Sequence, residues 1–171
     1  MSGYIHVYTG NGKGKTTAAI GLAIRAAGAG KSVFIAQFVK GMHYAEIESL
    51  KRFEPQIMLE QFGRDCFIMH APEDEDIRIA REGLKKVSEI ITSGVYDILI
   101  LDEACIALYY KLFTLKELTD VISVRPQDME IIITGRYAPP ELIEMADLVT
   151  EMKEIKHYYN KGIEARKGIE F

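Results

Sequence analysis

Cysteine is scarce in this sequence, and its scarcity excludes several chemistries. The two cysteines, Cys66 and Cys105, match no metal-ligand spacing and are too few for a disulfide framework. Both stand among apolar residues, so we expect ordinary buried or half-buried thiols. No two of the four histidines share a metal-binding spacing, and no Ser-His-Asp or Cys-His arrangement can be argued from the residue order. A zinc centre and a catalytic triad are therefore not expected.

Long apolar runs and an excess of positive charge are also missing. No apolar stretch approaches the roughly 20 residues that span a bilayer. The first residues contain no basic region followed by an apolar run, so no signal peptide is expected. The 21 basic residues are outnumbered by 25 acidic ones, which argues against DNA or RNA as a partner. We predict a cytoplasmic protein without a membrane or nucleic-acid partner.

What is present is the composition of one globular domain. The chain has 171 residues, of which 48% are hydrophobic and 27% are charged. The sequence contains no repeats, no low-complexity segment and no linker rich in proline, glycine or serine. A single domain over residues 1–171 is predicted, with a tail over residues 152–171 whose structure the pattern does not define.

Alternating strand and helix patterns predict the fold class. Apolar and β-branched runs predict strands over residues 4–8, 32–38, 56–62, 97–101, 130–134 and 148–152. Helical spacing and stop residues predict helices over residues 16–27, 44–53, 73–94, 104–110, 115–121 and 140–145. The acidic residues 73–76 fall on the first turn of a helix, where the helix dipole favours carboxylates, so we interpret them as capping rather than metal-binding. The alternation predicts an α/β domain with a mostly parallel sheet flanked by helices.

The most specific motif lies between the first predicted strand and helix and reads Thr9-Gly10-Asn11-Gly12-Lys13-Gly14-Lys15-Thr16-Thr17. Its glycines let consecutive backbone N–H groups point into one concavity, and the helix start adds partial positive charge. Lys15 can reach phosphate oxygens, and the Thr16 hydroxyl can ligate a magnesium ion held by phosphates. Thr9 stands where the usual pattern has its first glycine. The motif predicts a P-loop that binds ATP with Mg²⁺ or Mn²⁺, in a P-loop NTPase-like (RecA-like) fold.

An acidic pair and an arginine are the next candidates. Asp102 and Glu103 follow the apolar strand 97–101, as expected of the acid that lies beside the metal in a P-loop protein. Carboxylates at a strand end also commonly cap a following helix, so this pair is informative mainly because the P-loop is present. Arg136 directly follows the strand 130–134, where it can contact phosphate or form a surface ion pair.

These motifs, taken together, resemble the P-loop type ATP:cob(I)alamin (corrinoid) adenosyltransferases over nearly the whole chain. The resemblance rests on the P-loop and on residues 37–41, 101–103, 133–136, 138–139, 146–152, 156–157 and 162–171. It implies that a reduced Co(I) corrinoid attacks the 5′ carbon of ATP and releases triphosphate. It further implies that the nucleotide lies reversed in the loop, with Asn11 and Lys13 on its terminal phosphate and with Thr16 and Glu103 at the metal, next to Asp102.

The resemblance also concerns the corrinoid, the electron donor and the assembly. Family members place aromatic residues, including a tryptophan, in the loop after the third strand; this chain has no tryptophan, and Phe67 with Met69 are the corrinoid-facing counterparts. A homodimer and a flavoprotein or other reductant are the family expectations. Two other interpretations stay open: a P-loop ATPase or small-molecule kinase that transfers the γ-phosphoryl group, and a non-catalytic ATP-dependent corrinoid carrier.

Overall fold

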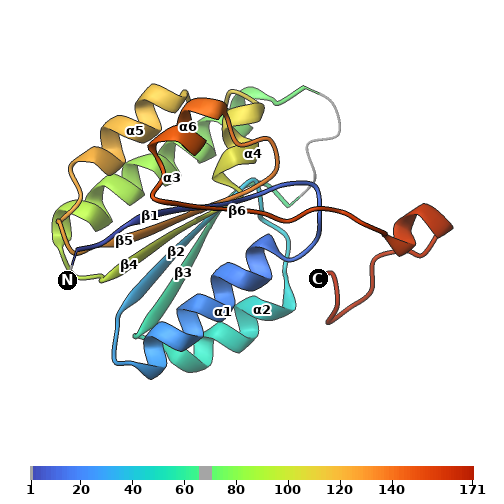
Figure 1. Cartoon of the computed structure of the whole chain (residues 1–171), viewed down its shortest axis with the longest axis horizontal. Helices are drawn as coiled ribbons and strands as arrows, with labels where there is room; N and C mark the ends of the chain where they lie inside the picture. The colour runs from blue at the N-terminus through green and yellow to red at the C-terminus, as the bar shows by residue number, and fades with distance from the viewer. Residues whose placement is uncertain (1, 66–70) are drawn as a thin grey trace.

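One sheet of six parallel strands organises the protein (Figure 1). The computed structural model describes residues 2–65 and 71–171. Its strands are β1 (Ile5–Thr9), β2 (Val33–Phe38), β3 (Ile57–Phe62), β4 (Ile98–Asp102), β5 (Glu130–Thr134) and β6 (Leu148–Glu151). The strands lie in the order β3-β2-β4-β5-β1-β6. The predicted α/β class is confirmed, and the sheet is parallel at each of its five strand pairs.

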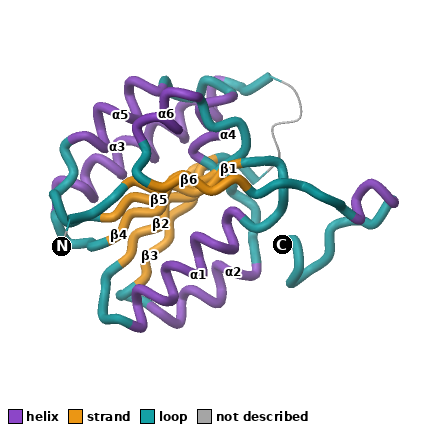
Figure 2. Tube along the Cα trace, viewed as in Figure 1, coloured by secondary structure: helices purple, strands orange, loops and turns teal. Residues whose placement is uncertain are grey.

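Helices cover both faces of this sheet (Figures 1 and 2). The helices are α1 (Lys15–Gly28), α2 (Ala45–Leu50), α3 (Asp74–Ser93), α4 (Ala104–Tyr109), α5 (Leu115–Ser123) and α6 (Pro140–Met145), with 3-10 turns η1 (Lys51–Phe53) and η2 (Tyr158–Lys161). α1 and α2 lie on one face, and α3 to α6 lie on the other. No helix within the described ranges is both long and apolar enough to cross a membrane.

Two hydrophobic cores result from this layering. The alanine-rich side of α1, including Ala19 and Ala23, packs on Ile35, Ile100 and Ile132 of the central strands. Larger side chains fill the opposite face, where α3, α4 and α5 pack on β2, β4 and β5. β2 and β4 are buried at every position, which is why they read as continuous apolar runs in the sequence.

The acidic start of α3 caps that helix, as predicted. Glu73 and Asp76 form a capping box, in which the side chain of each accepts a hydrogen bond from the backbone N–H of the other. Asp76 Oδ2 lies 2.8 Å from Glu73 N. The acidic run therefore satisfies orphan amides of the first turn.

The tail that the sequence pattern left undefined continues from the edge strand β6. It passes the loop between β1 and α1, extends away from the sheet to the turn η2, and then turns back toward the start of α1 (Figure 1). The backbone N–H of Met152 donates to Thr9 O at 2.8 Å, and Gly12 N donates to Met152 O at 2.6 Å. The start of the tail is thus held directly against the glycine-rich loop.

Candidate active site

The candidate site lies at the carboxyl ends of the strands, where parallel α/β sheets place their ligands. The strand register brings the site residues to one edge. Gln37 of β2 pairs with Asp102 of β4, and Tyr8 of β1 pairs with Thr134 of β5. α1 begins at the same edge, directly after the loop that follows β1.

The glycine-rich loop is closed around the ammonium group of Lys15. Lys15 Nζ donates hydrogen bonds of 2.8 Å to the carbonyl oxygens of Gly10 and Gly12. The residue is 6% exposed, and its burial lowers the pKa of the ammonium from the ordinary lysine value. The chain therefore holds this positive charge inside the loop.

Close approach of the tail explains two of the glycines. A Cβ atom on Gly10 or Gly12 would lie 2.6 Å from Met152 O, and Gly10 has a φ of 95°. Gly14 has a φ of 115° and supplies the left-handed residue immediately before α1. Side chains at these positions would separate the loop from the segment that follows β6.

Asp102 is the centre of a buried hydrogen-bond network. It is 1% exposed, and its Oδ1 atom accepts from the hydroxyl groups of Thr16 at 2.8 Å and Thr134 at 2.7 Å. Its Oδ2 atom accepts from Gln37 Nε2 at 3.2 Å and from Lys40 Nζ at 2.8 Å. Four donors thus stabilise one buried carboxylate.

Oxygen ligands of the kind that magnesium prefers meet at this point. The Thr16 hydroxyl and the Asp102 carboxylate are 2.8 Å apart, and Glu103 is the next residue in the chain. Magnesium is usually bound by one or two carboxylates together with substrate phosphates and water. Within residues 2–65 and 71–171, no three acidic, histidine or cysteine side chains cluster as a complete metal site. The residues present fit a cation that arrives with a nucleotide.

Glu103 stands in an unusual backbone conformation beside this network. Its φ of 57° is left-handed, and its backbone N–H donates to Thr134 Oγ1 at 3.0 Å. Burial, followed by repulsion from Asp102, raises the pKa of the Glu103 carboxyl group. Strained non-glycine residues of this kind concentrate at functional sites.

The remaining predicted nucleotide-binding residues lie around the loop. Thr9 is buried at the end of β1, and its Oγ1 atom accepts a 3.4 Å hydrogen bond from the backbone of Ala138. Asn11 and Thr17 are exposed. Arg136 is exposed after β5, and its charge acts on both Lys15 and Glu103. The fold brings all of these positions to the same edge of the sheet.

Lys13 contacts the far end of the tail. Its ammonium group donates to Ile169 O at 2.6 Å, to Glu170 Oε1 at 2.8 Å and to the Tyr158 hydroxyl at 3.4 Å. Tyr158 also hydrogen bonds to Glu170, and the Arg166 guanidinium lies 4.8 Å from the centre of the Tyr158 ring. The loop lysine and the tail are therefore joined by one polar cluster.

Sequence reasoning missed several members of these networks. Gln37, Lys40 and Thr134 surround Asp102 but were noted only as parts of motifs that resemble a family. Polar residues at the ends of buried strands were the sign that could have identified them. Phe67 and Met69, predicted to face a corrinoid, lie outside the described residues.

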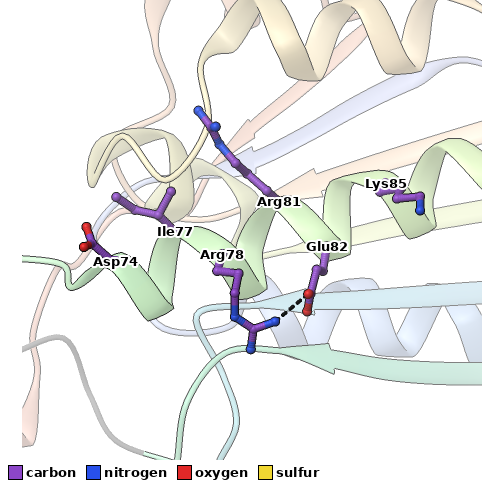
Figure 3. A pocket seen from close by; sticks show the side chains of 6 residues that line it. All are labelled: Asp74, Ile77, Arg78, Arg81, Glu82 and Lys85. Carbon is purple, nitrogen blue, oxygen red and sulfur yellow. Dashed lines mark hydrogen bonds and ion pairs between the residues drawn. The ribbon is translucent and has the colours of Figure 1, made fainter.

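A separate hollow of about 550 Å³ lies along the outer side of α3 (Figure 3). It is lined by Asp74, Ile77, Arg78, Arg81, Glu82 and Lys85. Arg78 forms ion pairs with Glu75 and Glu82 within the same helix. The lining contains none of the predicted nucleotide-binding residues, so we do not assign this hollow to the active site.

A parallel sheet with a glycine-rich loop, a buried lysine and a strand-end acid defines the class of P-loop NTPase-like proteins. The structure is similar to flagellar accessory protein FlaH from Methanocaldococcus jannaschii, with a TM-score of 0.62 and 14% identity over 88% of this chain and 71% of that one. At this identity the likeness supports the fold alone.

The chain belongs to the family of ATP:corrinoid adenosyltransferases BtuR/CobO/CobP, whose family model matches residues 1–171. Among its relatives, the corrinoid adenosyltransferase of Escherichia coli (strain K12) is 35% identical over 99% of this chain and 86% of its own length. The corresponding proteins of Pseudomonas aeruginosa and Salmonella typhimurium are 35% and 33% identical, with 84% and 86% of their lengths covered. The resemblance inferred from the motifs is thus confirmed.

Proposed function

We propose that this protein transfers the 5′-deoxyadenosyl group of ATP to the Co(I) centre of a reduced corrinoid and releases triphosphate. The observation that carries the proposal is the loop that holds Lys15, in a chain that matches the adenosyltransferase family from end to end. The reaction belongs to the assembly or salvage of adenosylated corrinoids.

The chemical step needs positioning and charge stabilisation more than proton transfer. A cobalt–carbon bond forms to C5′ while the bond from C5′ to the triphosphate oxygen breaks, and its electron pair leaves with triphosphate. Co(I) supplies the attacking electron pair, so no base is required. Cys105 is not a competing nucleophile, because burial raises the pKa of its thiol to about 12. The residues must hold C5′ in line with cobalt and stabilise the leaving anion.

Residues of the loop carry the phosphate-binding part of this proposal. Lys15 and the backbone amides after Thr9 would bind the polyphosphate, with Thr17 and Arg136 at its border. Asn11 and Lys13 would hold the terminal phosphate of a nucleotide that lies reversed in the loop. Support comes from their convergence at one edge of the sheet and from the positive charges of Lys13, Lys15 and the start of α1 at that edge.

Thr16, Asp102 and Glu103 form the metal-binding part. A magnesium or manganese ion bound there would neutralise charge on the triphosphate. Thr16 would offer its hydroxyl oxygen and the two acids their carboxylate oxygens. Two observations support this metal-binding role: Thr16 Oγ1 lies 2.8 Å from Asp102 Oδ1, and Glu103 is the next residue in the chain.

The residues that face the corrinoid, the reductant and the oligomeric state are proposed from the family. Phe67 and Met69 would face the corrinoid, and a flavoprotein or another reductant would supply Co(I). We infer a homodimer. Exposed apolar side chains on α6 and on the edge strand β6 support this inference, among them Ile143, Leu148 and Val149. We expect the protein to act in the cytoplasm.

An anaerobic assay tests the reaction. The protein is mixed with Mg²⁺, ATP and a chemically reduced Co(I) corrinoid, and the cobalt spectrum is followed together with inorganic triphosphate. A light-sensitive adenosyl-corrinoid with an equal amount of triphosphate is expected. ADP with unchanged corrinoid would assign a kinase or ATPase instead, and tight binding without turnover would assign a carrier.

A further inference from the structure

Lys40 places a positive charge at the point where Thr16 and Asp102 meet. Its ammonium nitrogen lies 2.8 Å from Asp102 Oδ2 and 3.1 Å from Thr16 Oγ1. The Thr16 hydroxyl itself donates to the other carboxylate oxygen of Asp102 at 2.8 Å. One lysine therefore contacts both Thr16 and Asp102 at the end of β4.

The contacts of Lys40 are those of an enclosed ion rather than a surface ion pair. The side chain of Lys40 is 14% exposed and that of Asp102 is 2% exposed. The aromatic ring of Tyr44 lies on a further side, with its centre 5.3 Å from the Lys40 nitrogen. A lysine ammonium is a compact charge with three donors, which suits a small site of this kind.

The backbone before Lys40 is shaped to deliver this side chain. Val39 has a φ of 61°, which a β-branched residue rarely adopts. Its N–H donates to Phe62 O at 3.1 Å and so keeps the end of β2 tied to β3. The chain then turns, and Lys40 reaches across to β4. Such a conformation persists only where surrounding contacts enforce it, and the Lys40–Asp102 ion pair is one of these contacts.

A divalent cation and the Lys40 ammonium cannot use these oxygens together. Magnesium would bind the same Thr16 and Asp102 atoms, and two cations in contact repel strongly in a site with little water. The remaining acceptor positions of the Asp102 carboxylate are occupied as well, because Thr16, Gln37 and Thr134 donate hydrogen bonds to them.

We propose that Lys40 is an internal cation that neutralises Asp102 and hydrogen bonds to Thr16 in the nucleotide-free protein, leaves when a divalent cation arrives with ATP, and then binds the polyphosphate. The proposal rests on ATP with a metal as the ligand of this site. It explains how a buried carboxylate stays compensated before the nucleotide arrives. It also couples metal and nucleotide binding, because the displaced ammonium requires a new anion and the triphosphate supplies one.

Binding of Mn²⁺ to the nucleotide-free protein, followed by electron paramagnetic resonance, tests the competition. Lys40→Met removes the charge while keeping a chain of similar length, and we expect it to bind Mn²⁺ at least about tenfold more tightly than the wild type. Lys40→Arg keeps a competing cation and should bind Mn²⁺ as weakly as the wild type. Lys31→Met is the matched control, because Lys31 forms an exposed 2.8 Å pair with Asp97 away from the loop.

Equal Mn²⁺ affinity in the wild type and Lys40→Met would overturn the proposal. If Lys40→Met does not fold without metal, Lys40→Gln is titrated instead, and Mn²⁺ should raise its unfolding temperature more than that of the wild type. An equal rise in the unfolding temperature of the two proteins would again contradict the competition.

Binding of ATP in EDTA and in Mg²⁺ tests the second half. At saturating Mg²⁺, Lys40→Met should bind ATP about tenfold more weakly than the wild type, because the displaced Lys40 ammonium then contacts the polyphosphate; in EDTA, where Lys40 stays on Asp102, this difference should disappear. Equal ATP affinity of the two proteins at saturating Mg²⁺ would show that Lys40 does not reach the nucleotide. These titrations use no corrinoid, so their outcome is separate from that of the transfer assay.

Discussion

The hydroxyl group of Thr16 donates a 2.8 Å hydrogen bond to Asp102, which joins the first turn of α1 to the end of β4. The two residues are 86 positions apart in the sequence. Their contact connects the phosphate-binding loop to the buried polar network between the central strands. Changes in either residue are therefore expected to affect both ligand binding and the fold.

Lys15→Ala should abolish most of the binding of ATP. The substitution removes the ammonium that the loop carbonyls of Gly10 and Gly12 now hold, and we expect a loss of at least about a hundredfold in kcat/KM for ATP. Steady-state kinetics of adenosyl transfer and calorimetric titration of ATP measure it. Lys31→Ala serves as a control, and near-normal activity of Lys15→Ala would remove this lysine from the mechanism.

Asp102→Asn and Glu103→Gln should differ in their effect on stability. Asn at position 102 offers one acceptor to four donors and leaves Lys40 without its buried counter-ion, so we expect a loss of roughly 3 kcal/mol in the free energy of unfolding. Burial raises the pKa of Glu103, which means that its charged form is disfavoured in the folded protein. Glu103→Gln should therefore not destabilise the fold.

Both substitutions should weaken metal-dependent transfer at least about tenfold. Urea unfolding and Mg²⁺-dependent kinetics of the two variants separate the effects. If Asp102→Asn unfolds at the same urea concentration as the wild type, the network around Asp102 contributes less than its geometry indicates.

Glu170→Gln should strengthen the binding of ATP. The Glu170 carboxylate holds the Lys13 ammonium at 2.8 Å, and under the proposed function the terminal phosphate of ATP would replace it. Exposed ion pairs are weak, so a gain of up to about fivefold in affinity is expected at low salt, and less at high salt. Glu164→Gln, in the same exposed tail, is the control. Weaker ATP binding in Glu170→Gln would mean that the tail orients Lys13 toward the phosphate.

The contact between Lys13 and Glu170 should persist at neutral pH. Hydrogen bonds from Lys13 and Tyr158 lower the pKa of Glu170 to about 2, below the ordinary value of about 4.3. A depressed carboxyl pKa stabilises the docked tail above the ordinary value, and this contribution is lost as the pH falls toward about 2. A pH titration of the Glu170 side chain by NMR checks the direction, and Lys13→Met should return the pKa toward its ordinary value.

Cys105 should be unreactive in the folded protein. Burial, followed by repulsion from Glu103, raises the pKa of its thiol to about 12, so the thiol stays protonated at pH 8. In a Cys66→Ser background, Ellman's reagent at pH 8 should detect no thiol in the native state and one thiol in denaturant. Rapid labelling of the native variant would contradict this burial.

The local pattern predicted the secondary structure closely. The expected strand 130–134 and helix 140–145 agree with β5 and α6 at both ends. The predicted helix 44–53 divides into α2 and the turn η1, because the chain tightens before a proline. The spacing of apolar residues in a strand or helix depends on neighbouring residues and on whether one face or both are buried. This spacing can be recognised directly in the sequence.

The structure brings the predicted candidate residues together, and sequence reasoning missed several residues that contact them. Lys15, Thr16, Asp102 and Glu103 stand in motifs with a fixed spacing, so the sequence was sufficient to name them as candidates. Lys40 has no such spacing, and its contact with Asp102 depends on how far β2 lies from β4 and on the turn at Val39. The residues of the tail that reach Lys13 likewise have no periodic pattern.

The sequence by itself determined the fold class, the phosphate-binding loop and the family, because each depends on local spacing or on the order of short motifs. Only the tertiary structure decided which charges compensate one another. Asp102 pairs with Lys40, and Lys13 pairs with Glu170, across 62 and 157 positions of the chain. An electrostatic partner is chosen by distance in space and by burial, and neither can be obtained from sequence separation.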